Sequence, residues 1–164
     1  MVDSTAFGEL TSTQAAVLEQ LDSYRVEYLV IGGFAVRHYG YERPTADLDI
    51  LVVPDKDNID RLQQALRQMG GKNLEDLAEH FQKPRPMVKI WDVEFFAFIP
   101  GLDTAQLKAN ADRLTVALPN KYSASVLVIS RNDLLAAKRL AAEDAARGDK
   151  QAADLLDLKM LRDL

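Results

Sequence analysis

Two glycines between apolar runs, followed by two closely spaced aspartates, constrain the fold of this chain more than any other feature. The apolar run 26–31 ends at Gly32 and Gly33, and Asp47 and Asp49 open the next apolar run. Such runs are typical of buried strands, and glycine suits the turn that ends a strand and begins a helix. Residues two apart in a strand face the same side, so both carboxylates are expected to point at one spot.

The same segment predicts a chemistry as well as a fold. Two carboxylates aimed at one point repel each other, and a divalent cation with oxygen ligands neutralises them. The glycine turn opens a short helix over 34–39 and offers backbone N–H groups suited to an anion. An exposed strand edge that happens to be acidic is the plain alternative, but aspartate is unfavourable in a strand of Leu, Ile and Val. The pattern therefore favours a metal ion beside a phosphate group.

These residues also resemble a known motif. The segments Ile31-Gly32-Gly33 and Asp47-Leu48-Asp49-Ile50 are similar to the hG[GS] and DhDh parts of the motif of the DNA polymerase β-like nucleotidyltransferase superfamily. The residues between them, 34–46, resemble a small bacterial branch that includes abortive-infection toxin-like and antibiotic-modifying nucleotidyltransferases. The resemblance extends over residues 26–160, and the glycine and carboxylate segment is its most specific part.

The resemblance implies a fold, a reaction and partners. The fold would be α/β, with a small mixed sheet of about four or five strands, flanking helices and a C-terminal helical pair, in one domain over residues 1–164. The reaction would be the transfer of a nucleoside monophosphate from a nucleoside triphosphate such as ATP to an acceptor hydroxyl, on an antibiotic-like molecule, a tRNA or a protein. Two Mg²⁺ (or Mn²⁺) ions would assist it. The toxin-like branch implies an antitoxin partner.

Three carboxylates are the predicted catalytic and metal-binding residues. By resemblance, Asp47 and Asp49 would hold the ions, and Glu94, on a neighbouring strand, would bind the ion that activates the acceptor hydroxyl. Asp92 is the alternative to Glu94, because the two share a face if the strand through them is continuous.

The predicted nucleotide-binding residues are Gly32, Gly33, Arg43 and Lys138. The resemblance implies that the glycine turn holds the β- and γ-phosphates and that Lys138 points toward the triphosphate or the acceptor. Arg43 could instead pair with Asp47. Lys138 could be a surface lysine whose apolar stem lies along its helix.

Two departures from the superfamily pattern support a different interpretation. Gly33 lacks the hydroxyl that serine provides in some relatives, and Glu94 replaces the more usual aspartate. The chain could therefore be a nucleotide-binding or regulatory module with impaired catalysis. A metal-dependent phosphohydrolase that uses the same carboxylates is a further alternative.

The rest of the chain predicts a helix-rich frame around the strands. Helix caps are expected at Thr11 or Thr13, at Asp55 and at Ser130. The segment 87–99 could form one strand or a hairpin that bends near residues 91–92. Its aromatic residues are expected in the core rather than on a base-stacking surface: Trp91, Phe95, Phe96 and Phe98. A short strand over 126–129 precedes the last two helices.

Composition excludes several classes of function. The 164 residues carry a net charge of -5, which argues against broad, non-specific nucleic-acid binding and leaves only local basic clusters such as Lys83, Arg85 and Lys89. The absence of cysteine excludes disulfides and thiolate metal sites. No signal peptide or membrane-spanning run is evident, so a cytoplasmic location is expected.

Overall fold

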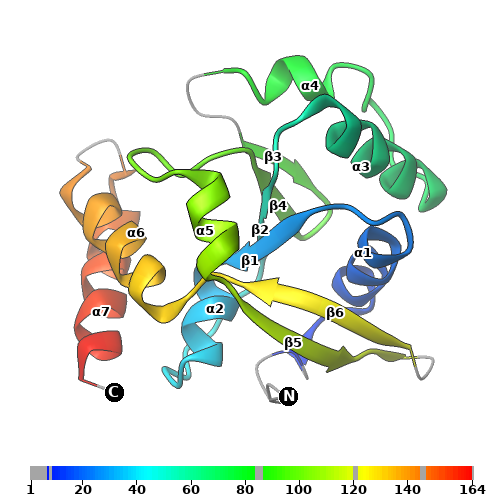
Figure 1. Ribbon diagram of the computed structural model, residues 1–164. Coiled ribbons are helices and arrows are strands. Elements are labelled where there is room, and N and C mark those ends of the chain that lie inside the picture. Colours follow the sequence, from blue (N-terminus) through cyan, green and yellow to red (C-terminus); the bar gives the residue numbers. More distant parts are fainter. Residues whose placement is uncertain (1–6, 8, 84–86, 120–121, 145–146, 164) are drawn as a thin grey trace.

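The computed structural model describes residues 7, 9–83, 87–119, 122–144 and 147–163 (Figure 1). The elements, in chain order, are α1 (Ser12–Ser23), β1 (Tyr28–Ile31), α2 (Gly32–His38), β2 (Leu48–Val52), α3 (Lys56–Gln68), α4 (Leu77–His80), β3 (Met87–Ile90), β4 (Val93–Phe96), α5 (Thr104–Asn110), β5 (Asp112–Ala117), β6 (Ser123–Val128), α6 (Arg131–Glu143) and α7 (Lys150–Arg162).

One mixed sheet of six strands forms the centre, in the order β3-β4-β2-β1-β6-β5. The pairs β1–β6 and β2–β4 are parallel, and the other neighbours are antiparallel. The helical pair α6 and α7 lies on one side of the molecule and α1 and α3 lie on the other, with the strands between them (Figure 1). The predicted α/β class with a C-terminal helical pair is confirmed. In the part of the chain that the structure describes, no helix combines the length and apolar character needed to cross a bilayer.

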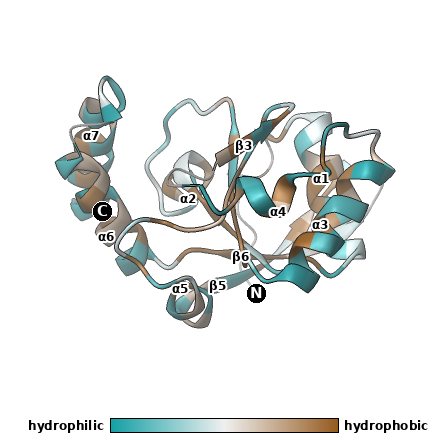
Figure 2. Cartoon of the chain, turned by 90° about the horizontal axis from the view of Figure 1, so that it is seen from above, coloured by the Kyte–Doolittle hydropathy of each residue, from teal (hydrophilic) through white to brown (hydrophobic). Residues whose placement is uncertain are grey.

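The two strands that flank the glycine turn form the middle of the core. All four residues of β1 are buried, and so is every residue of β2 except Asp49. Apolar residues of α1 and α3, such as Leu18 and Leu62, are fully buried as well. Burial of this kind contributes about 25 cal/mol for each Å² of apolar surface. Figure 2 shows the hydrophobic colour along the central strands and the hydrophilic colour over much of α3 and α4.

The sheet has more strands than the four or five expected from the sequence. The unpredicted strand is β5, where only Leu114 and Val116 are buried. Two apolar residues are too few to mark a strand by alternation alone, and β5 is defined by its pairing with β6. Helix α5 was not predicted either. Of the two candidates for the first cap, Thr11 is the residue that caps α1, and the caps expected at Asp55 and Ser130 are confirmed.

Residues 87–96 form a hairpin rather than one long strand. Ile90 pairs with Val93 across the turn, and Trp91 has a positive φ of 55°. Phe95 is fully buried, as expected for a core residue. The expectation of core packing is wrong for Trp91 and Phe98, which are exposed because one lies in the turn and the other beyond the end of β4.

Gln14, a buried residue of α1, ties this hairpin turn to the start of β2. Its Nε2 donates to the carbonyl oxygens of Ala46 (2.9 Å) and Asp92 (3.0 Å). Its Oε1 accepts from the Thr11 amide in the capping box of α1. The Asp92 carbonyl also accepts from the Leu48 amide. One amide side chain therefore fixes both segments that carry the predicted carboxylates.

Replacing Gln14 by methionine should destabilise the protein. The Ala46 carbonyl would lose its Nε2 donor and the Asp92 carbonyl would keep one donor, at a cost of about 1–3 kcal/mol. For a chain of this size that cost corresponds to a melting temperature lower by roughly 3–8 °C, measurable by thermal unfolding. Gln64→Met, at an exposed position of α3, is the matched control and should leave the melting temperature unchanged. Equal melting of the two variants would contradict this role of Gln14.

Candidate active site

The structure brings the three predicted carboxylates to one edge of the sheet. Asp47 directly precedes β2, and Asp49 is the second residue of that strand. Glu94 is the parallel register partner of Asp49 on β4. The edge is the one at which β1 ends, so the glycine turn lies there too. The sheet topology therefore gathers residues as far apart in the sequence as Gly32 and Glu94.

Asp49 sits in an environment that disfavours its charge. Its Oδ1 is buried and has no hydrogen-bond partner. Burial raises the pKa of Asp49 well above its usual range, and the hydrogen bond and the negative charge of Glu94 raise it further. The charge of Lys138 opposes this shift and that of Asp47 adds to it. A bound cation would offset both the free-energy cost of burying the Asp49 charge and its repulsion from Glu94 and Asp47.

The backbone of the glycine turn lies directly against Asp49. Gly32 has a φ of +66°, and a Cβ placed on it would stand 2.1 Å from Asp49 Oδ2. Only glycine fits such a position, both for its conformation and for its space. A Cβ on Gly33 would stand 2.5 Å from Thr45 Oγ1. A serine at position 33 therefore has no room in this chain, because the Thr45 hydroxyl already lies there.

Asp92, the alternative third carboxylate, lies apart from this cluster. The hairpin places it in the turn, and its Oδ2 accepts a hydrogen bond of 2.6 Å from the Thr11 hydroxyl. Asp92 was the alternative because it would share a face with Glu94 on one continuous strand. The hairpin shows that no continuous strand runs through both residues. The geometry favours Glu94 as the partner of Asp49.

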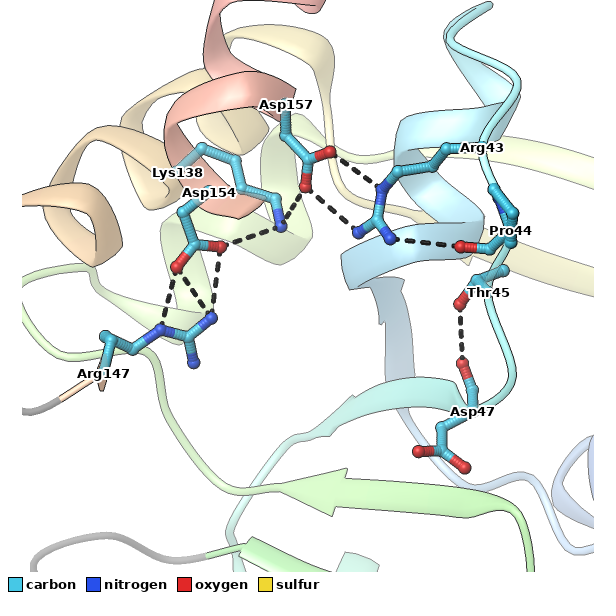
Figure 3. Close-up of polar contacts among 8 residues, drawn as sticks. All are labelled: Arg43, Pro44, Thr45, Asp47, Lys138, Arg147, Asp154 and Asp157. Atoms are coloured by element: carbon cyan, nitrogen blue, oxygen red, sulfur yellow. Dashed lines mark hydrogen bonds and ion pairs between the residues drawn. The ribbon is translucent and has the colours of Figure 1, made fainter. Parts of the chain in front are cut away.

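Arg43 and Lys138 belong to a chain of ion pairs, shown in Figure 3. Arg43 contacts Asp157 through Nε (2.8 Å) and through a second guanidinium nitrogen (3.0 Å). Lys138 Nζ lies 2.9 Å from Asp157 and 3.3 Å from Asp154, which Arg147 also contacts at 2.8 Å. Arg43 therefore does not pair with Asp47, which was the alternative considered for it. Lys138 is buried and so is not the surface lysine that was the alternative there.

The two aspartates of this ion-pair network were not predicted from the sequence as site residues. Asp154 and Asp157 are 2% and 1% exposed, and buried carboxylates require partners. Their spacing of three on the last helix was the available signal, since it places both on one helix face. The chain of ion pairs joins α6 and α7 to the segment that leads into Asp47.

Lys89 also reaches the carboxylates. It is the register partner of Glu94 on β3, and its Nζ lies 3.3 Å from Asp47 Oδ2. The side chains of Lys89 and Asp47 are 50% and 31% exposed. Of the three basic residues named for a local cluster, Lys89 is the one next to the site, Lys83 contacts His80, and Arg85 lies outside the described residues.

The donor set suits a hard divalent cation, although the carboxylates do not yet converge on one. Three carboxylates, one with a buried oxygen that lacks a partner, match the oxygen ligands that Mg²⁺ takes in proteins. Among the residues described, no three acidic, histidine or cysteine side chains surround a common point. Asp47 is turned to Lys89 instead. It would have to leave that partner to join Asp49 and Glu94 around an ion.

Comparisons with known proteins agree with this geometry. None of the curated protein sequences matches the chain. An antigenic nucleotidyltransferase-like protein from Paracoccidioides brasiliensis has a similar fold, with a TM-score of 0.57 and 19% identity over 96% of this chain and 76% of that one. The family model described as "Nucleotidyl transferase AbiEii toxin, Type IV TA system" matches residues 16–163. The chain therefore belongs to the AbiEii family of nucleotidyltransferase toxins, within the polymerase β-like superfamily that its glycine and aspartate motif resembles.

Proposed function

We propose that this protein transfers a nucleoside monophosphate from a nucleoside triphosphate to an acceptor hydroxyl with the help of Mg²⁺ or Mn²⁺. The observation that carries the proposal is the contact of three groups at one sheet edge. Asp49 and Glu94 are register partners, and the Gly32 backbone lies against the Asp49 carboxylate. The proposed cation site would lie directly beside the backbone of the glycine turn, in a member of a nucleotidyltransferase family.

Each residue has a definite part in the proposed reaction. Asp47, Asp49 and Glu94 would hold the ions, which when bound stabilise the attacking and leaving oxygens of an in-line displacement. The turn at Gly32 and Gly33 would hold the β- and γ-phosphates, and the absence of a side chain at Gly32 makes room for the Asp49 carboxylate beside it. The acceptor oxygen forms a bond to the α-phosphorus, and the bond from that phosphorus to pyrophosphate breaks.

Arg43 and Lys138 supply positive charge on the helical side of the site. The charge of Lys138 already reaches Asp49, and a guanidinium nitrogen of Arg43 would lie 3.5 Å from a Cβ on Gly33. Together with Arg147 they surround the two buried aspartates. With cations bound to Asp47, Asp49 and Glu94, these positive charges would favour an anionic ligand such as a triphosphate.

A toxin role with an antitoxin partner is part of the proposal. It rests on the family to which the chain belongs, whose description is that of a type IV toxin–antitoxin system. The acceptor would then be a component of the cell whose modification is harmful. A small antibiotic-like molecule, a tRNA and a protein differ in size and are separable by experiment.

Labelled nucleotides identify the reaction and the acceptor together. The protein is incubated with cell extract, Mg²⁺ or Mn²⁺, and each nucleoside triphosphate labelled at the α-phosphate. The expected result is label in one acceptor species and release of an equal amount of pyrophosphate. Free labelled monophosphate without an acceptor would instead show a phosphohydrolase. Nucleotide binding without any product would show an impaired binding module.

Asp49→Asn should stabilise the ligand-free protein and abolish its response to ligand. The folded state of the wild type holds the Asp49 proton more tightly than the unfolded chain does, since the pKa of Asp49 is raised on folding. Wild-type stability is therefore lost as the pH rises above the usual aspartate value of 3.8. The variant avoids this loss, so its melting temperature should exceed that of the wild type at neutral pH. Below about pH 3 the difference should vanish.

The same thermal unfolding measurement, repeated with Mn²⁺ and a nucleoside triphosphate, tests the ligand site. The wild type should melt at a higher temperature with ligand, and Asp49→Asn should not. Asp60→Asn, on the exposed side of α3, is the control and should behave as the wild type in both conditions. A destabilised Asp49→Asn protein at neutral pH would show that Asp49 has a structural role instead.

Conservative variants separate Glu94 from Asp92. Glu94→Gln keeps the size of the side chain but removes a ligand charge, and it should lower transfer by about a hundredfold or more. Asp92→Asn keeps an oxygen that can accept from the Thr11 hydroxyl and should change transfer by less than about threefold. Rates are measured with the acceptor found by labelling. The opposite order of losses would place the third ligand in the hairpin turn.

A further inference from the structure

We infer that Lys89 is a built-in counter-ion of Asp47, which a divalent cation must displace before the carboxylate site can close around it. Lys89 thereby sets the affinity of the site for metal. The inference rests on the proposed function, because it takes Asp47 as a ligand of the ion.

The register of the sheet places Lys89 on the same face as the carboxylates. Lys89 pairs with Glu94 across β3 and β4, and Glu94 pairs with Asp49 across β4 and β2. Residues in one such row point to the same side of a sheet. Lys89 Nζ reaches past Glu94 to within 3.3 Å of Asp47 Oδ2. An ammonium group therefore occupies a position at the rim of the predicted cation site.

Exposure separates this ion pair from the other pairs near the site. Lys89 and Asp47 are 50% and 31% exposed, whereas the aspartates that hold Lys138 are at most 3% exposed. An exposed pair contributes only about 0–1 kcal/mol, but breaking a buried pair costs about 3–5 kcal/mol. The Lys89–Asp47 pair is therefore the one that an incoming cation can open at low cost.

Replacement of Lys89 by a divalent cation would explain why the three carboxylates do not surround a common point in the ligand-free protein. Asp49 and Glu94 are register partners on neighbouring strands, and Asp47 forms an ion pair with Lys89. A divalent ion carries twice the charge of an ammonium group and can accept oxygens from several carboxylates at once. It would draw Asp47 toward Asp49 and release Lys89 to solvent. Among the described residues, Lys89 is the cation that forms an ion pair with Asp47, so its removal would remove that competing charge.

Lys89→Met should therefore bind metal more tightly, which is a gain that a merely structural lysine would not produce. Mn²⁺ binding to the protein without nucleotide is measured by electron paramagnetic resonance or calorimetry. The expected gain in affinity for the variant is about threefold to tenfold. Lys89→Gln, which keeps a polar side chain on this edge strand, should show the same gain. Lys89→Arg retains the charge and should not.

Two comparisons make the assignment specific. Lys108→Met removes a half-exposed lysine that pairs with Glu27 at the opposite edge of the sheet, so it controls for the change in net charge and should leave Mn²⁺ affinity unchanged. In an Asp47→Asn background, Lys89→Met should lose most of its gain, because the pair it breaks is already absent.

The outcomes are distinguishable from a failure of the proposed function. If the wild type binds no Mn²⁺, with or without a nucleoside triphosphate, the proposed function itself is contradicted. If the wild type binds Mn²⁺ and folded Lys89→Met and Lys89→Gln proteins bind it equally or more weakly, Lys89 is not a counter-ion of the site. An equal gain in Lys108→Met would reduce the effect to net charge and would overturn the inference as well.

Discussion

Mutual repulsion of carboxylates at one sheet edge is the constraint on which the rest of the structure depends. Parallel pairing of β2 and β4 brings Asp49 and Glu94 side by side, and burial makes the charge of Asp49 costly. Lys138 of the helical pair offsets part of this cost at Asp49, and Lys89 of the edge hairpin forms an ion pair with Asp47. The strand order that gathers these carboxylates thus brings lysines from the helical pair and from the hairpin close to them.

The C-terminal helices belong to the site for the same reason. Asp154 and Asp157 are buried on α7, and they hold Lys138 of α6 and Arg43 of the segment before β2. Removing one partner of such a network leaves an uncompensated buried charge. The network consequently holds Arg43 near Gly33 and Lys138 within reach of the Asp49 charge. Positive charge on this side of the site is positioned in advance rather than recruited on binding.

Local signals in the sequence were sufficient for the motif but not for its surroundings. The glycine turn, the strand that carries Asp49 and the caps at Thr11, Asp55 and Ser130 each depend on a few adjacent residues, and all of these structural elements form as predicted. Strand β5, the contacts of Gln14 and the row from Lys89 to Asp49 depend on pairing between distant segments. A single sequence does not specify such pairing, because a shift of one residue would reverse every side chain. Thr45 is an intermediate case. It lies two residues before Asp47, but only the folded structure shows that its hydroxyl fills the space beside Gly33.

The contrast between buried and exposed ion pairs suggests how a ligand would enter the site. On the helical side, the carboxylates that hold Arg43 and Lys138 are nearly inaccessible, and their pairs are costly to open. On the hairpin side, the pair between Lys89 and Asp47 is half exposed and inexpensive to exchange. In the proposed mechanism, a cation that enters from the hairpin side would disturb only this second pair. The structure therefore combines buried ion pairs that are costly to open with one exposed ion pair that is inexpensive to exchange, and the proposed metal site lies at the exposed one.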